Sequence, residues 1–359
     1  MESRIGIKQL LNEFRKKLDK HLENFFDRKI SQASEISPLV SSMVKNLREF
    51  TLRPAKRVRA AFCYYGYLAC GGKNKKAALE ASMFIELIHS YLLIHDDIID
   101  RDEFRRGKAT MHNLYKKIYR SKSKIKDAEH FGVSMAIMAG DLASALGYEI
   151  LIQSRFPDTL KLKALAKLNQ SLFDVDAGQI LDEFLEINSK PVLDDVLTVF
   201  KYKTNKYTVE GPLHIGAILG EADLKILNVF SRYSLPLGIA FQIQDDILGM
   251  FGSAKKIGKP VGSDLREGKQ TILIVKALER ADKRQKKIII SNLRKKKITR
   301  EDLQKVRKII IDTGSLDYSK RLALRLTSQA KEIIKKTPLA DEGKIFLEKI
   351  PDYIVARDH

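Results

Sequence analysis

Apolar residues recur along most of the chain with the period of an α-helix. Between residues 84 and 95, the largely apolar set follows the spacing i, i+3, i+4, i+7: Phe84, Leu87, Ile88, Tyr91, Leu92 and His95. Residues 160–175 nearly repeat this spacing. Residues 1–26 mix charged and apolar positions with the same period, which predicts a helix and excludes a signal peptide.

No segment shows the alternation typical of a half-buried strand. The runs "KKIIISNL" and "RKIIIDTG" are rich in β-branched residues, but they are short and isolated, so packing could make them helical. Turn residues separate the helices without forming a flexible linker, for example at Cys70-Gly71-Gly72. The pattern therefore predicts an all-α protein whose 359 residues form a single domain, residues 1–359.

Residues 131–152 are the most membrane-like stretch of the sequence. Asp141 stands in the middle of this stretch and Glu149 near its end. Because a carboxylate is costly in lipid, the stretch predicts a buried core helix and no transmembrane segment. The two cysteines, Cys63 and Cys70, cannot build a disulfide framework or a zinc site, so we expect buried thiols in a reducing cytoplasm.

Hydrophobic content of 44% is enough for a sizeable core, whereas the net charge of +20 is unevenly distributed. Residues 280–308 contain thirteen Lys or Arg but only three Asp or Glu, so half of the excess positive charge lies in this stretch. We interpret this stretch as a solvated helical face. We expect no nucleic-acid partner, and weak contact with an anionic membrane surface stays open.

Two long apolar runs each end in a pair of aspartates. "FIELIHSYLLIHDDIID" contains Asp96-Asp97, and "YSLPLGIAFQIQDDILG" contains Asp245-Asp246. On a helix, Asp96 and Asp100 lie one turn apart on the same face. Such carboxylates oppose the helix dipole and repel one another, so a cation is needed to offset their charge. Mg²⁺ is suitable because it binds one or two carboxylates and fills its remaining coordination positions with water and phosphate oxygens. Solvated helix ends are the alternative, but they do not explain two matching clusters.

Basic residues follow each cluster. Arg105 and Arg106 come after the first, and the second is followed by Lys259, Arg266 and Lys269. Arginine binds phosphate through two hydrogen bonds and lysine acts as a point charge. Acidic residues that hold a metal and basic residues that hold phosphate oxygens together predict a diphosphate site. The apolar runs beside them predict that the rest of the substrate is hydrophobic.

These motifs resemble the trans-isoprenyl diphosphate synthases, or polyprenyl synthetase family, and most closely its short-chain geranylgeranyl-type branch. The resemblance runs from about Arg53 to Thr271 and includes "DDIIDRDEFRRG", "FQIQDDILG", the Lys203-Thr204 pair in "YKTNKYTVEGPL", and "GKPVGSDLREGKQT". It implies the isoprenoid synthase fold, in which mostly antiparallel helices surround a central prenyl-binding cavity. It also implies a cytoplasmic homodimer.

The resemblance further implies a division of labour among the residues. Three Mg²⁺ ions would bind Asp96, Asp100 and Asp245, with Asp246 and Asp264 as further candidates near Asp245. The allylic diphosphate would be held by Arg105, Lys203, Lys259 and Lys269. Isopentenyl diphosphate would lie on Lys56, Arg59, His89 and Arg106. Residues acting directly in catalysis would be Asp96, Asp100, Lys203, Thr204, Gln242 and Asp245, with Thr204 and Gln242 facing the developing carbocation and contacting substrate.

The implied reaction is the Mg²⁺-dependent head-to-tail (1′-4) condensation of isopentenyl diphosphate with dimethylallyl, geranyl or farnesyl diphosphate. Tyr91 and Leu92, five and four residues before Asp96, would form the floor that stops the growing chain at C20 geranylgeranyl diphosphate. Alternatives are a farnesyl, C25 or longer polyprenyl diphosphate synthase, a terpene cyclase of similar fold, and a non-catalytic relative. The nearly complete aspartate motifs count against the last.

Two departures from the family pattern affect these expectations. The usual Gly-Gly-Lys-Arg-x-Arg-Pro segment appears as "LRPAKRVRA", which keeps Lys56, Arg57 and Arg59 but lacks the glycines and the final proline. The isopentenyl diphosphate pocket is therefore expected with less support than the metal site. Gly249 stands where the second cluster usually has a third aspartate, which we interpret as one ligand fewer.

Overall fold

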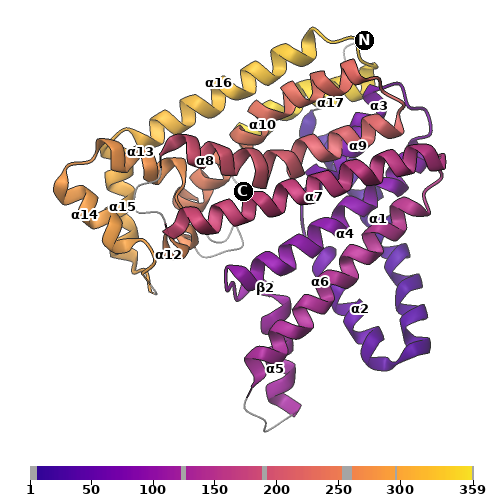
Figure 1. Ribbon diagram of the computed structural model, residues 1–359, viewed down its shortest axis with the longest axis horizontal. Coiled ribbons are helices and arrows are strands. Elements are labelled where there is room, and N and C mark those ends of the chain that lie inside the picture. Colours follow the sequence, from indigo (N-terminus) through magenta and orange to yellow (C-terminus); the bar gives the residue numbers. More distant parts are fainter. Residues whose placement is uncertain (1–5, 123–126, 188–191, 253–260, 296, 358–359) are drawn as a thin grey trace.

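The computed structural model describes residues 6–122, 127–187, 192–252, 261–295 and 297–357, and nearly all of them are helical (Figure 1). The first half contains α1 (Ile7–Ile36), α2 (Pro38–Thr51), α3 (Val58–Ala69), α4 (Lys75–Ile99), β1 (Phe104–Arg105), β2 (Lys108–Ala109), α5 (Met111–Lys122), α6 (Ala128–Ile152) and α7 (Asp158–Ile187). The second half contains α8 (Leu193–Val199), η1 (Phe200–Glu210), α9 (Gly211–Leu219), α10 (Leu224–Phe251), α12 (Ser263–Glu267), α13 (Ile272–Arg280), α14 (Lys283–Asn292), α15 (Arg300–Asp312), α16 (Ser315–Lys335) and α17 (Asp341–Ala356). The predicted all-α fold is confirmed.

The helices pack around two apolar cores. The larger core joins α1 to α7 with α9 and the C-terminal helices, and the smaller one lies among η1, α10 and α12 to α16. α4 packs mainly against α6, whereas α10 packs against both η1 and α16. Because α10 contributes side chains to both cores, it connects the two halves of the molecule seen in Figure 1.

The helices predicted from the apolar spacing are present. α4 begins after Asn74, whose side chain accepts a hydrogen bond from the Ala77 amide, and it ends at Ile99. The two β-branched runs lie in α14 and α15, each of which starts with a reciprocal capping box that favours a helix. Packing and capping therefore outweigh the strand propensity of these runs.

Among the residues that the structure describes, two helices, α4 and α6, are long and apolar enough to cross a membrane by length and composition alone. In α4, 72% of the most apolar window is buried inside the protein, and in α6 the share is 44%. The two helices pack against each other, as core helices of a folded domain do. Residues 131–152 therefore form a helix that packs on a core helix but, unlike the expected buried helix, is only partly buried within this chain.

The segment η1 is a π-helix that carries the lysine-threonine pair. It packs against α7 at Gly178, where an added Cβ would lie 2.2 Å from the backbone nitrogen of Lys203. Only glycine permits this close approach. π-Helical turns are rare and frequently occur at functional sites, because the wider turn changes where side chains point. Here the wide turn and Gly178 together bring Lys203 and Thr204 beside α7.

The short hairpin β1–β2 was not predicted from the sequence. Arg106 and Gly107 at its tip both have positive φ, 53° and 75°, as a tight two-residue hairpin turn requires. Arg53, at the end of α2, donates hydrogen bonds to the carbonyls of Arg105 and Ala109 at 3.2 and 2.9 Å. The hairpin is thereby anchored above the end of α4.

Candidate active site

Both aspartate clusters line one cavity of about 550 Å³ between α4, α7, η1 and α10. Asp96 and Asp100 come from the end of α4, and Asp245 and Asp246 from the last turns of α10. α10 continues to Phe251, so the second pair lies within the helix and not at its end. The lining includes most of the predicted site residues: Arg59, His89, Tyr91, Leu92, Asp96, Asp100, Lys203, Thr204, Gln242, Asp245 and Lys269.

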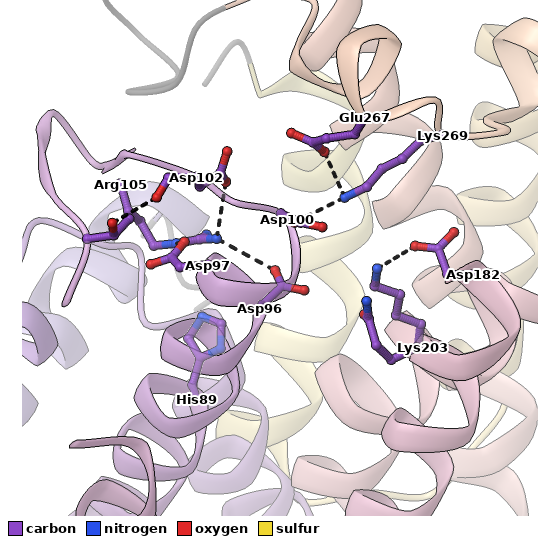
Figure 2. A network of polar contacts seen from close by, with 12 residues as sticks. His89, Asp96, Asp97, Asp100, Asp102, Arg105, Asp182, Lys203, Glu267 and Lys269 are labelled. Atoms are coloured by element: carbon purple, nitrogen blue, oxygen red, sulfur yellow. Dashed lines mark hydrogen bonds and ion pairs between the residues drawn. The ribbon is translucent and has the colours of Figure 1, made fainter. Parts of the chain in front are cut away.

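The first cluster is partly neutralised by a lysine from the opposite wall. Lys269 Nζ lies 3.3 Å from Asp100 Oδ2 and 3.1 Å from Glu267 Oε2 (Figure 2). Burial lowers the pKa of Lys269, but Asp100 and Glu267 raise it more, so this lysine stays charged. Burial and the adjacent Asp96 raise the pKa of Asp100 to about 7. The Asp96–Asp100 pair therefore takes up positive charge readily.

Asp97 points to the other side of α4 and is completely buried. Its Oδ1 accepts a hydrogen bond of 2.5 Å from Arg105 Nε, while Arg105 Nη2 lies 3.6 Å from Asp96 and 3.8 Å from Asp102. Arg105 does not line the main cavity, but it lies beside Asp96, which does (Figure 2). Its contacts connect the aspartate-rich helix end to the hairpin, and its expected role in holding the allylic diphosphate stays a prediction.

Lys203 projects from η1 toward the first cluster. Its Nζ donates a hydrogen bond of 2.5 Å to Asp182 Oδ2 on α7, as Figure 2 shows. Burial and Lys269 lower the pKa of Lys203, but Asp182, Asp96 and Asp100 raise it more. Asp182 lines the cavity and was not predicted from the sequence. α7 carries several other charged residues, so no signal in the sequence distinguishes Asp182 from them.

The second cluster is linked to the π-helix and to the C-terminal end of the chain. Thr204 Oγ1 donates to Gln242 Oε1 at 2.7 Å, and Gln242 Nε2 donates to Asp246 Oδ1 at 2.8 Å. The other oxygen of Asp246 is buried and has no hydrogen-bond partner. Burial and Asp264 raise the pKa of Asp246 well above its ordinary value. Arg357 Nη2 lies 2.6 Å from Asp245 Oδ1.

Gly249 makes room for Asp264. A Cβ at position 249 would lie 2.6 Å from Asp264 Oδ2, which is closer than real Cβ contacts. Asp264 comes from α12 and lines the same cavity as the second cluster. Position 249 lacks the carboxylate that the family pattern has there, but Asp264 places a carboxylate directly beside it.

A second, smaller pocket of about 160 Å³ collects the residues expected for isopentenyl diphosphate. Lys56, Arg59, His89 and Arg106 all line it, together with Arg57, Glu86, Tyr353 and Arg357 among others. Arg59, His89 and Phe241 line both pockets, so the two sites are adjacent. Burial and the neighbouring Arg57 lower the pKa of Arg106 to about 10. This concentration of positive charge is suited to an anion.

His89 lies where the two pockets meet. Arg59 Nη1 lies 3.3 Å from His89 Nε2. Because a guanidinium can only donate, Nε2 must accept, and the ring proton lies on Nδ1. Nδ1 is buried without a partner. Burial, followed by the charges of Arg59 and Arg106, lowers the pKa of His89 well below 6.5. His89 is therefore neutral at the place where the two pockets meet.

The apolar end of the cavity is lined by the predicted floor residues, Tyr91 and Leu92, with Leu93 beside them. The Tyr91 ring meets the His95 ring edge-on at a centroid distance of 4.9 Å. Both residues lie on α4 before Asp96, so the cavity extends along this helix from the charged end.

The donors in the main cavity fit a hard cation. All candidate ligands are carboxylates, and one buried oxygen of Asp246 lacks a partner. Within the described ranges, no three Asp, Glu, His or Cys side chains already converge as a metal-binding group. That arrangement suits Mg²⁺, which takes one or two carboxylates and completes its shell with water and phosphate oxygens.

Two basic residues that follow the second aspartate cluster in the sequence, Lys259 and Arg266, are not among the described residues that line either pocket. Lys259 falls outside the described residues. Arg266 Nη2 lies 3.3 Å from Asp102 Oδ1 and so connects α12 to the segment after α4. Tyr353 and Arg357, near the C-terminal end, also line the small pocket, although no local sequence motif predicts this.

The fold and these two sites define a helical prenyltransferase with the isoprenoid synthase fold. Residues 40–310 match the family model described as polyprenyl synthetase. A geranylfarnesyl diphosphate synthase of Aeropyrum pernix is 34% identical over 84% of this chain and 90% of its own length. A geranylgeranyl diphosphate synthase of Saccharolobus solfataricus is 33% identical over 86% and 89%. The chain belongs to the polyprenyl synthetase family.

Solved structures agree with this assignment. The crystal structure of a geranylgeranyl pyrophosphate synthase from Corynebacterium glutamicum, complexed with isoprenyl diphosphate and magnesium, has a TM-score of 0.92 to this chain at 31% identity. The match covers 97% of this chain and 99% of that one.

We expect His89 to remain neutral well below pH 6.5, and Arg59→Gln to raise its pKa by removing the nearest positive charge. Since the unfolded state takes up this proton at about pH 6.5, His89 lowers the stability of the folded state as pH falls below that value. An NMR titration of labelled imidazole rings measures both effects. Arg266→Gln, away from the ring, serves as the control, and titration of wild-type His89 near 6.5 would contradict the prediction.

Proposed function

We propose that the enzyme catalyses the head-to-tail (1′-4) condensation of isopentenyl diphosphate with allylic diphosphates and makes mainly geranylgeranyl diphosphate. One observation carries this proposal. A cavity with two aspartate clusters adjoins a small cationic pocket through Arg59 and His89, so two diphosphates can bind with their reacting carbons close together. The matching family and the named relatives support the same chemistry.

In this proposal Lys203 and Lys269 hold the allylic diphosphate against the first cluster. Three Mg²⁺ ions, held by Asp96, Asp100 and Asp245, supply Lewis-acid stabilisation of the departing pyrophosphate when bound. The allylic C–O bond breaks and its electron pair goes to pyrophosphate. The double bond of isopentenyl diphosphate then forms the new C–C bond, and a proton leaves its C2 toward pyrophosphate.

The other site residues orient the substrates. Lys56, Arg59, His89 and Arg106 would hold isopentenyl diphosphate, while the Thr204–Gln242 pair presents oxygen dipoles to the allylic cation. Apolar side chains among those that line the cavity, such as Val199, Phe200 and Phe241, would exclude water from that cation. Because α10 joins both cores, we propose that residues 1–359 work as one catalytic domain.

Alanine substitution at Asp96, Asp100 or Asp245 should each lower turnover on the order of 10²-fold, since each removes preorganised charge stabilisation. The assay is incubation with Mg²⁺, an allylic diphosphate and labelled isopentenyl diphosphate, followed by chromatography of the products. The exposed Asp158→Ala variant is the control. Full activity in EDTA would refute metal dependence, and cyclised hydrocarbon products would instead favour a terpene cyclase.

Chain length should be set at the apolar end of the cavity. Tyr91 and Leu92 lie roughly 6 to 7.5 Å before Asp96 along α4, at about 1.5 Å per residue. Tyr91→Ala should remove the floor and lengthen the main product by at least one C5 unit. Leu79→Ala, which shortens a buried side chain of α4 outside the cavity, is the control. An unchanged product profile would place the limit on another helix, and a C25 product from the wild type would favour the geranylfarnesyl alternative.

We further propose a homodimer that pairs through α6 and α7. α7 crosses the near face of the molecule in Figure 1 and presents an exposed apolar stripe: Phe173, Ile180, Phe184 and Ile187. Ile137 and Met138 of α6 are also exposed. Monomers rarely leave such a stripe uncovered, and two-fold pairing is the commonest way to cover it.

Sedimentation velocity at micromolar concentration should give about twice the chain mass of 40.9 kDa. Phe173→Glu combined with Phe184→Glu should shift the protein to monomer, because two charges would be buried at the interface. Leu224→Glu, at an exposed position elsewhere, should leave the dimer intact. A wild-type monomer at this concentration would refute the proposal.

A further inference from the structure

The loop before α3 holds an arginine in a strained conformation. Arg57 has φ = 55°, in the left-handed region that side chains other than glycine, asparagine and aspartate rarely adopt. It stands directly between Lys56 and Val58, and Arg59 follows within the first turn of α3. The loop lacks the paired glycines of the family pattern, since Pro54 and Ala55 occupy their places. Some interaction must therefore hold this backbone.

Two ion pairs hold Arg57. Its Nε donates to Asp19 Oδ1 on α1 at 2.9 Å, and its Nη1 donates to Glu86 Oε2 on α4 at 2.8 Å. Arg57 is 4% exposed and Glu86 is 2% exposed, so this pairing takes place inside the protein. The start of α3 is thereby tied to two other helices. Charge-assisted hydrogen bonds in such surroundings fix geometry strongly.

The position of Glu86 is unexpected for electrostatic reasons. Glu86 lines the small cationic pocket, one helical turn before His89. A carboxylate in that position repels a diphosphate and by charge alone weakens its binding. A carboxylate at this position is compatible with diphosphate binding if holding Arg57 in place stabilises the complex more than the negative charge of Glu86 destabilises it.

We propose that Asp19, Arg57 and Glu86 form a clamp that positions Lys56 and Arg59 to bind the diphosphate of isopentenyl diphosphate. Arg57 is a positioning residue, because its own side chain faces Asp19 and Glu86 while it stands between the two basic residues that it orients. The inference rests on the proposed function, which assigns isopentenyl diphosphate to the small pocket. In the proposed function the allylic diphosphate is held by Lys203 and Lys269, and the three clamp residues do not line the main cavity.

The test is isothermal titration with isopentenyl diphosphate in EDTA, where no turnover occurs, together with KM values for both substrates in Mg²⁺. Glu86→Gln removes the negative charge and keeps the shape. The clamp predicts at least about tenfold weaker binding of isopentenyl diphosphate and an allylic KM within about twofold of wild type. If Glu86 acted only through its charge, the same variant would bind more tightly. Tighter or unchanged binding overturns the proposal.

Further variants separate positioning from folding. Asp19→Asn, at the more exposed end of the clamp, should weaken binding in the same direction but less. Arg57→Gly permits the left-handed backbone without the ion pairs, so wild-type affinity in this variant would also overturn the proposal. If Glu86→Gln proves unstable in a thermal melt, the apolar double variant Arg57→Met with Glu86→Leu replaces it and should fold yet bind weakly.

A matched control exists elsewhere in the protein. Glu210 is 4% exposed and lies 3.4 Å from Lys167 and 2.6 Å from Lys206, outside both pockets. Glu210→Gln should not change the affinity for isopentenyl diphosphate selectively, and a selective loss in this control would overturn the clamp as the cause. Absence of binding by the wild type would instead refute the proposed function itself.

Discussion

The structure depends on placing several carboxylates at the end of an apolar helix without letting them repel one another. The carboxylates at the end of α4 are paired with cations on two different sides of the helix. Asp97 faces inward to Arg105, whereas Asp100 faces the cavity and meets Lys269 from the opposite wall. Burial, and then the neighbouring Asp96, still raise the pKa of Asp100 although Lys269 lowers it. α4, η1 and the segment after α10 meet here, and Lys203 and Lys269 bring positive charge to the carboxylates of α4.

The π-helix η1 shows how backbone geometry serves this arrangement. Gly178 lets α7 approach the Lys203 backbone, and the acid of α7, Asp182, then fixes the lysine side chain. One residue further, Thr204 contacts Gln242 of α10. A regular α-helix would direct these two side chains differently relative to their partners. The unusual turn therefore links three walls of the cavity.

The sequence predicts the helices and both aspartate clusters because these depend on local spacing. It also predicts Lys56, Arg59, His89 and Arg106, which gather in one pocket although they come from three separate segments. The hairpin, Asp182 and Arg357 escaped prediction, since their contacts join residues that are far apart in the chain and carry no periodic signal. Arg105 illustrates a further limit: the motif identifies this charged residue, but it does not indicate that its side chain contacts Asp97 and Asp96.

The contact between Gly249 and Asp264 couples two neighbouring positions of the cavity wall. A Cβ at position 249 would lie 2.6 Å from Asp264 Oδ2, so any side chain placed there would require the Asp264 carboxylate to move. An aspartate at position 249 would compete with Asp264 for the space beside the second cluster. The number of carboxylates on this wall therefore cannot be raised at position 249 without also rearranging α12.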